Sequence, residues 1–207
     1  MDFRHVIPLG ARCRLTHNLR LHFGGEGKFP FDWFILPLPG LLTCLEEGLD
    51  AARIYDPGRL TALRDAKGML HSVRNTRLGI LHHHDFPRGE GDSLLPGWQE
   101  QIPKAAARFA HLAGRLRAAA AEGPVLYVRE HHKHDDPAAL ARLQAMLRNL
   151  APGAGFRLLA VNYEPGAVPA GIEAITVQEE GEGRGWRGDP QAWGAALAST
   201  GHRLLPR

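Results

Sequence analysis

Cys13 is the residue whose type and position best suit covalent chemistry in this chain of 207 residues. It lies in VIPLGARCRLTHNLR, residues 6–20, where an apolar run gives way to helical spacing. A thiol in the first turn of a helix faces unpaired backbone N–H groups and the positive end of the helix dipole, which favour the thiolate. The neighbouring Arg12 and Arg14 act in the same direction. The pattern predicts a nucleophile with a lowered pKa; the alternative is a buried structural thiol, because free cysteine is often buried.

Cys44, the second cysteine, lies in a short apolar stretch for which we predict a helix over Leu41–Leu49. No basic residue stands beside it to lower the pKa of its thiol, so we predict a structural role. A secreted protein stabilised by disulfides would normally carry more cysteines and a signal peptide. We therefore expect both thiols to be free.

Two histidine-rich clusters, residues 82–85 and 131–136, contain six of the twelve histidines. This composition suits zinc or a similar divalent metal. On a strand, however, only His82 and His84 would share a face, and no HExxH or CxxC spacing is present. We therefore name no metal ligand and expect the second cluster to be a solvated loop, with a metal-dependent enzyme as an alternative.

The elements that must position Cys13 follow an α/β pattern. A strand at Val6–Leu9 leads through Gly10 to a helix that begins near Cys13 and ends at the glycines from Gly24. The stretch KFPFDWFILPLPG then predicts an irregular, buried crossing, because its prolines interrupt a helix.

Later in the chain, VLYVRE (125–130), a helix ending at Leu150 and FRLLAVN (156–162) form a βαβ unit. Ligands of such sheets lie at the carboxyl ends of the strands, where Arg129, His131 and Asn162 stand. We also predict helices at 102–121 and 193–199 and a weak strand at 172–177.

Residues 55–79 carry weaker signals: a turn at YDPG, a brief helix at Leu60–Asp65 and a possible strand at 69–75. In LGILHHHDF, alternation predicts a strand with two distinct faces. One face would carry Leu81, His83 and Asp85, and the other His82, His84 and Phe86.

The predicted fold is a single α/β domain over residues 1–207, with three layers and helices on both faces of a mainly parallel sheet. We expect the first strand to lie centrally in this sheet, so that neighbouring loops meet at its carboxyl end. The core would be formed by Val6–Leu9, Val125–Val128 and Leu158–Val161.

The composition limits the kinds of partner that the protein is expected to bind. The net charge is only +3 and the arginines are scattered, so nucleic-acid binding is not required. No apolar stretch approaches the roughly 18 residues of a membrane span, and none resembles a signal peptide. We expect a soluble, cytoplasmic protein; its oligomeric state is left open.

Four motifs, PLGARCRLTHNLR, FPFDWFI, HHDF and VLYVRE, resemble in order and spacing the bacterial DUF1796 family, which is described as papain-like cysteine peptidases. The resemblance covers most of the chain. It implies that Cys13 is the nucleophile and His84 the base, with Asp32 as the orienting carboxylate and Asn162 as a weaker option. Backbone N–H groups at the start of the helix would stabilise the oxyanion.

The resemblance implies a hydrolase or acyltransferase that acts on an amide, ester or thioester without a cofactor. The substrate would be a small molecule, a peptide or a glycan-linked compound. Residues expected to bind it are Arg12, Trp33, Asp85, Arg129 and Asn162. A non-catalytic glycan- or protein-binding module is the main alternative.

Several of these residues have competing structural interpretations. Burying Asp32 unpaired would be costly, so it is expected to cap backbone N–H groups or to meet an arginine. Arg129 could form a surface salt bridge in place of binding an anion. Further residues that could line a pocket are Trp186, Arg187 and Asp189. Parallel strands also differ from the antiparallel sheet of papain, which points to a flavodoxin-like or SGNH-hydrolase-like arrangement.

Overall fold

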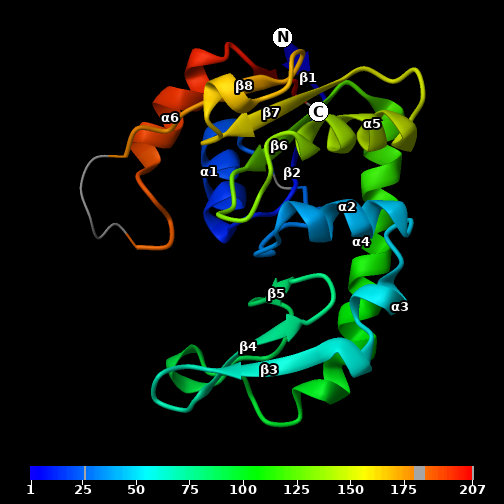
Figure 1. The fold of residues 1–207 in the computed structure, drawn as a ribbon, viewed down its shortest axis with the longest axis vertical. Helices are drawn as coiled ribbons and strands as arrows, with labels where there is room; N and C mark the ends of the chain where they lie inside the picture. Colours follow the sequence, from blue (N-terminus) through cyan, green and yellow to red (C-terminus); the bar gives the residue numbers. More distant parts are fainter. Residues whose placement is uncertain (26, 180–184, 207) are drawn as a thin grey trace.

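The computed structural model describes residues 1–25, 27–179 and 185–206 and has a mixed α/β fold (Figure 1). Its main sheet has four parallel strands in the order β2-β6-β7-β8. These strands are β2 (His5–Pro8), β6 (Val125–Glu130), β7 (Phe156–Val161) and β8 (Glu173–Ile175). The predicted parallel pairing of VLYVRE with FRLLAV is therefore confirmed.

The first long strand, β2, lies at the edge of this sheet, so the expectation of a central position was wrong. Ile7 of β2 pairs with Tyr127 of β6, and Tyr127 pairs on its other side with Leu158 of β7. The four strands lie side by side in the order in which they occur in the chain. Among the described residues, the strand order of this sheet therefore does not reverse at any point.

Side chains of β6 alternate between two hydrophobic clusters, because successive residues of a strand point to opposite faces. Leu126 and Val128 join a cluster with α1 (Cys13–Phe23) and α6 (Pro190–Ser199). This cluster also contains Trp193, which is almost fully buried.

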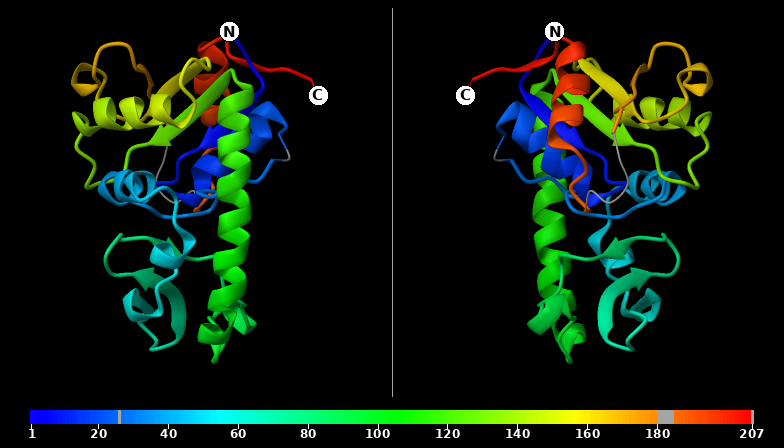
Figure 2. Two further views of the ribbon diagram at one scale, coloured as in Figure 1. Left: turned by 90° about the vertical axis from the view of Figure 1, so that its right-hand side faces the viewer. Right: turned by 90° about the vertical axis from the view of Figure 1, so that its left-hand side faces the viewer.

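The opposite face of β6, which includes Tyr127, packs in the larger cluster. This cluster receives side chains from α2 (Leu38–Glu46), α4 (Ile102–Glu122) and α5 (Ala139–Leu150). Helix α4 is long, and in both views of Figure 2 it extends beyond the main sheet toward a second, smaller sheet. The cluster also reaches that smaller sheet through Val73.

The smaller sheet is antiparallel and consists of β3 (Leu60–Arg64), β4 (Leu70–Asn75) and β5 (Leu81–His82). The possible strand at 69–75 is confirmed, but the brief helix predicted at Leu60–Asp65 is wrong. Pairing with β4 provides this segment with backbone hydrogen-bond partners, and tertiary context of this kind overrides weak local propensity.

Most other boundaries of helices and strands agree with those predicted from the sequence. Gly24, at φ 69°, ends α1 in the left-handed conformation that glycine adopts readily. Helix α2 begins earlier than predicted, at Leu38, because Pro39 is tolerated in a first turn. The remaining elements are short: β1 (Asp2–Phe3), β9 (Arg203–Leu204), α3 (Ala51–Ile54) and 3₁₀ turns at 57–59, 90–92, 98–101 and 165–167. Among the described residues, no helix is long and apolar enough to span a membrane.

Candidate functional site

Cys13 is the first residue of α1, directly after the turn that leaves the carboxyl end of β2. The turn is tight: Gly10 has φ 75°, and the buried Ala11 has φ 86°. Left-handed backbone at a residue other than glycine is strained and is often found at functional sites. Arg12, the N-cap residue, makes no side-chain capping hydrogen bond. The predicted strand, turn and helix around Cys13 are confirmed.

The Cys13 thiol is 8% exposed and donates a hydrogen bond to the carbonyl oxygen of Trp33 at 3.4 Å. Burial raises the pKa of this thiol to about 11, although the backbone N–H of Cys13 acts in the opposite direction. The expected lowering of the pKa was therefore wrong. Desolvation outweighs the helix terminus, and the thiol is protonated at neutral pH.

Cys13 and His84 line the same cavity, which has a volume of about 590 Å³. The cavity lies beside the carboxyl end of β2, on the side of the sheet where ligands were predicted. Its other lining residues are Arg12, Arg14, Ile35, His71, Leu81, His83, Asp92, Gly185 and Trp186.

Trp33 connects the two candidate catalytic residues. Its carbonyl oxygen contacts the Cys13 thiol, and its ring lies 5.4 Å, centroid to centroid, from the ring of His84. The ring of Trp186 lies 6.1 Å away on the same basis. Trp33 has φ 66°, a strained conformation for a bulky residue. The irregular crossing predicted around Trp33 thus contacts both candidate catalytic residues.

His84 is exposed and belongs to the chain that leaves β5. The pKa of its imidazole is lowered by partial desolvation and by the guanidinium of Arg88. A neutral imidazole can accept a proton at pH 7. Within residues 1–25, 27–179 and 185–206, His84 has aromatic neighbours but no hydrogen bond or ion pair that orients it.

Asp32 pairs with Arg20 rather than with His84. Its Oδ2 lies 2.5 Å from Nη2 of Arg20, and the Asp32 side chain is 5% exposed. Burial raises the pKa of this carboxyl to about 6, while Arg20 opposes the shift. The expectation that Asp32 would meet an arginine is confirmed. The guanidinium of Arg20 also lies 5.4 Å from the ring of Trp33, so Asp32 supports the cavity through these two residues.

Asp32 and His84 nevertheless share a smaller cavity of about 180 Å³. Trp33 and Asp85 also line it. His84 therefore separates two hollows, one that contains the Cys13 thiol and one that contains Asp32.

Asp85 is saturated by protein partners. It accepts a hydrogen bond from the Tyr55 hydroxyl at 2.8 Å, and it pairs with His82 at 2.8 Å and Arg108 at 2.5 Å. The alternation predicted for residues 81–86 holds only through His82, because the strand ends there and His84 turns outward while His82 stays buried. Of the two histidines, only His84 reaches the cavity of Cys13.

Arg129 and Asn162 serve the fold in the positions where the structure places them. Arg129 is fully buried and pairs with Asp135 at 2.7 Å, while its Nη1 donates to the Leu9 carbonyl at 3.0 Å. Asp135 also accepts a hydrogen bond from Tyr163. Asn162 accepts from the backbone N–H of Val177 at 2.8 Å. The second histidine cluster therefore includes one buried structural carboxylate, Asp135, which its polar sequence did not indicate.

Two residues at the site, His71 and Asp92, had no signal in the sequence. The ring of His71 lies 4.9 Å, centroid to centroid, from that of His83 at a tilt of 41°, and His83 lies 3.3 Å from Asp92. Burial lowers the pKa of His83 to about 4, and Arg88 acts in the same direction. These residues come from separate segments, so only the tertiary structure could bring them to the cavity.

Glu130, at the end of β6, was also not predicted. It is fully buried and pairs with Arg14 at 2.5 Å. Arg14 in turn meets Glu179 at 3.1 Å, so its charge is engaged by two carboxylates. Arg12 is the arginine beside Cys13 that stays exposed.

Cys13 and Cys44 are both free, as predicted, and both are buried. Burial raises the pKa of Cys44 to about 12, and Glu47 adds to the shift. No group of three or more metal-ligating side chains is placed to hold a metal ion in the described part of the chain. No protein-family model, curated protein or solved structure matches this chain.

Proposed function

We propose that the chain is a cysteine-dependent hydrolase or acyltransferase in which Cys13 attacks an amide, ester or thioester carbonyl. The observation that carries this proposal is the shared cavity: Cys13 and His84 come from distant segments and line the same hollow beside the strained turn after β2. The motifs that resemble the DUF1796 family also support it, since they include both residues.

In the proposed reaction, the neutral imidazole of His84 removes the proton from the thiol as sulfur bonds to the carbonyl carbon. The imidazolium then returns this proton to the departing amine, alcohol or thiol. Water attacks the resulting thioester to release the acid and the free thiol; another nucleophile in its place would give acyl transfer. Backbone N–H groups in the first turn of α1 would stabilise the oxyanion.

Because the pKa of the Cys13 thiol is high, substrate binding must assist the removal of its proton. The resting thiol is protonated and donates to the Trp33 carbonyl. Substrate binding would have to bring His84 within hydrogen-bond reach of the sulfur. Because His84 is exposed and has no fixing hydrogen bond among the described residues, its ring can be oriented by the ligand.

The cavity lining favours a substrate that carries both planar and polar groups. Trp186 offers an aromatic face, and the exposed Arg12 offers a cation next to the thiol. We therefore propose a small-molecule, peptide or glycan-linked acyl compound with an anionic or hydrogen-bonding group near the scissile carbonyl. Trp33 would act as a positioning residue through its contacts to Cys13 and His84.

The test uses p-nitrophenyl acetate as a reactive ester, with mass spectrometry to detect a covalent acetyl group. The intact chain should acquire one acetyl group at Cys13 and release p-nitrophenol in a burst. Cys13→Ala should abolish acylation, and His84→Ala should reduce its rate at least about tenfold. Cys44→Ala and His111→Ala are the matched controls and should acylate like the parent, since both residues lie outside the cavity.

A non-catalytic binding module is the second candidate, favoured by the protonated thiol and by the absence of an orienting hydrogen bond on His84 among the described residues. The same experiment separates the two. Equal, slow acylation of the parent and of His84→Ala, or acylation of surface residues alone, would reject the enzyme and favour the binding module.

We also propose that residues 1–207 form one domain with three layers, in which α1 and α6 cover one face of the main sheet and α2, α4 and α5 cover the other. The two clusters on opposite sides of β6 support this arrangement. A cytoplasmic location would suit the free thiols.

A further inference from the structure

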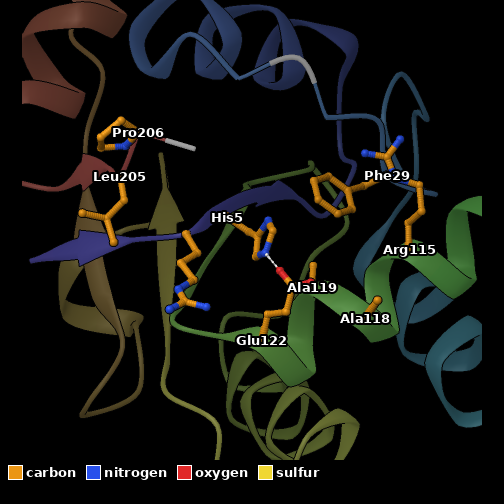
Figure 3. A pocket seen from close by; sticks show the side chains of 9 residues that line it. His5, Phe29, Arg115, Ala118, Ala119, Glu122, Leu205 and Pro206 are labelled. Carbon is orange, nitrogen blue, oxygen red and sulfur yellow. Dashed lines mark hydrogen bonds and ion pairs between the residues drawn. The ribbon is translucent and has the colours of Figure 1, made fainter.

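A third cavity, of about 700 Å³, lies at the opposite end of β2 from Cys13. Figure 3 shows that His5 of β2 projects into it, with Arg115 and Glu122 of α4 on one side and Leu205 and Pro206 of the C-terminal segment on the other. None of its lining residues lines the Cys13 cavity. It is therefore a separate site.

Two arginines line this cavity, and one of them, Arg115, acts electrostatically on the carboxyl of Asp32. Arg4 is exposed, and Arg115 is half-buried. Neither forms an ion pair with a carboxylate in the part of the chain that the structure describes. The guanidinium of Arg115 lies 5.8 Å from the ring centroid of Phe29, which holds it at the cavity wall. Guanidinium groups that form no ion pair can bind an anionic ligand.

Among the described residues that line the cavity, Glu122 is the one with a carboxylate, and this carboxylate pairs with His5. Oε2 of Glu122 lies 2.9 Å from Nε2 of His5, and this contact is the dashed line in Figure 3. The His5 side chain is 14% exposed, whereas that of Glu122 is 58% exposed. Because Glu122 is exposed, solvent screens its charge, and it repels a bound anion less than a buried carboxylate would.

The remaining wall is apolar. Phe29, Ala118, Ala119 and Leu205 contribute carbon surface around the charged groups. A smaller hollow continues from the cavity past Phe29 toward Phe23 and Leu204, and Arg4 and His5 line both spaces. A ligand with an aliphatic part could therefore bury that part while its charged group stays near the arginines.

We propose that this cavity binds an amphipathic carboxylate, with the anionic group attracted by Arg4 and Arg115 and an aliphatic chain on Phe29 and Leu205. A free fatty acid and the C-terminal carboxylate of an apolar peptide present the same chemistry. The site would bind either one independently of Cys13, since the two cavities share no residue.

Isothermal titration of the full chain with octanoate tests the proposal, with octanol and inorganic phosphate as probes that carry only one half of the ligand's chemistry. Octanoate should bind at least about tenfold more tightly than either probe, and more weakly as salt is raised. A trileucine peptide, with a free or amidated C-terminus, reveals which source the site prefers. Failure of both octanoate and the free peptide to bind would overturn the proposal, as would equal affinity for octanol.

Variants assign the binding to this cavity. Arg115→Gln and Arg4→Gln should each weaken octanoate binding about tenfold or more, whereas Arg157→Gln, an exposed arginine on β7, should leave it unchanged. Ala118 is an exposed residue of α4 that lines the cavity, so Ala118→Trp should fill the cavity and block binding. This variant keeps Arg115, so its result does not depend on whether the chain folds without that side chain. Unchanged affinity in Ala118→Trp would reject this location. Cys13→Ala should bind octanoate like the parent, so failure of the proposed catalysis leaves this test intact.

Discussion

The Cys13 thiol donates its hydrogen bond to the main-chain carbonyl of Trp33, 20 residues along the chain, at 3.4 Å. This contact joins the start of α1 to the irregular crossing after it. The sulfur is mostly buried, and the ring of the same Trp33 lies 5.4 Å, centroid to centroid, from that of His84. The reactivity of the thiol is therefore set by burial as much as by its place at a helix terminus.

Alkylation of Cys13 should be slow at neutral pH and should accelerate with pH. With a pKa of about 11, roughly one thiol in a thousand is ionised at pH 8, and this fraction grows about tenfold per pH unit. Peptide mass spectrometry after iodoacetamide treatment measures the rate. Cys44, which is 1% exposed, should react more slowly at every pH. A rate at Cys13 that levels off below pH 8 would contradict this prediction.

Asp32 should make stability fall as pH rises from about 4 to about 6. Its pKa is raised to about 6 in the folded chain, so between its unfolded value of 3.8 and 6 the folded state binds more protons than the unfolded state. The contribution lost across this window is on the order of 3 kcal/mol. Asp32→Asn should remove this part of the pH dependence in urea unfolding. The exposed Asp2→Asn is the control, and an identical pH profile for Asp32→Asn and the parent would refute the assignment.

Asp135→Ala should lower the free energy of unfolding by about 3–5 kcal/mol, because it leaves the buried Arg129 charge without its partner. Urea unfolding followed by circular dichroism measures the loss. The adjacent Asp136 caps the N–H of Ala138, and asparagine caps nearly as well, so Asp136→Asn should change stability by less than about 1 kcal/mol. Equal effects of the two substitutions would be inconsistent with the buried pair.

Gly40→Ala should destabilise the chain, in spite of the higher helix propensity of alanine. A Cβ at position 40 would overlap the carbonyl oxygen of Leu78, so α2 and this backbone would have to separate. We expect a cost of about 1–3 kcal/mol. At Gly114, in α4, a Cβ meets nothing within 4 Å, so Gly114→Ala should stabilise by about 0.5–1 kcal/mol. Thermal unfolding of both variants checks the opposite signs.

The sequence by itself determined the elements with strong local signals. Val125–Glu130 and Phe156–Val161 are apolar runs separated by an amphipathic helix, and a right-handed crossover makes such strands parallel. Gly24 ended α1 because its left-handed φ is cheap only for glycine. The position of Cys13 at the start of α1 followed from the same local pattern. These features depend on neighbours in the chain, which the sequence displays directly.

Only the tertiary structure decided the chemistry at each side chain. Burial, which local sequence does not reveal, raised the pKa of Cys13 although its helix terminus and arginines predicted the opposite. Asp32 pairs with Arg20, and Asp85 is bound by Arg108, His82 and Tyr55, because packing determines which of several possible partners lie within reach. The edge position of β2 and the strand at Leu60–Arg64 depended likewise on pairing between distant segments. Such contacts arise from packing between distant segments, and no short stretch of residues determines the energy of that packing.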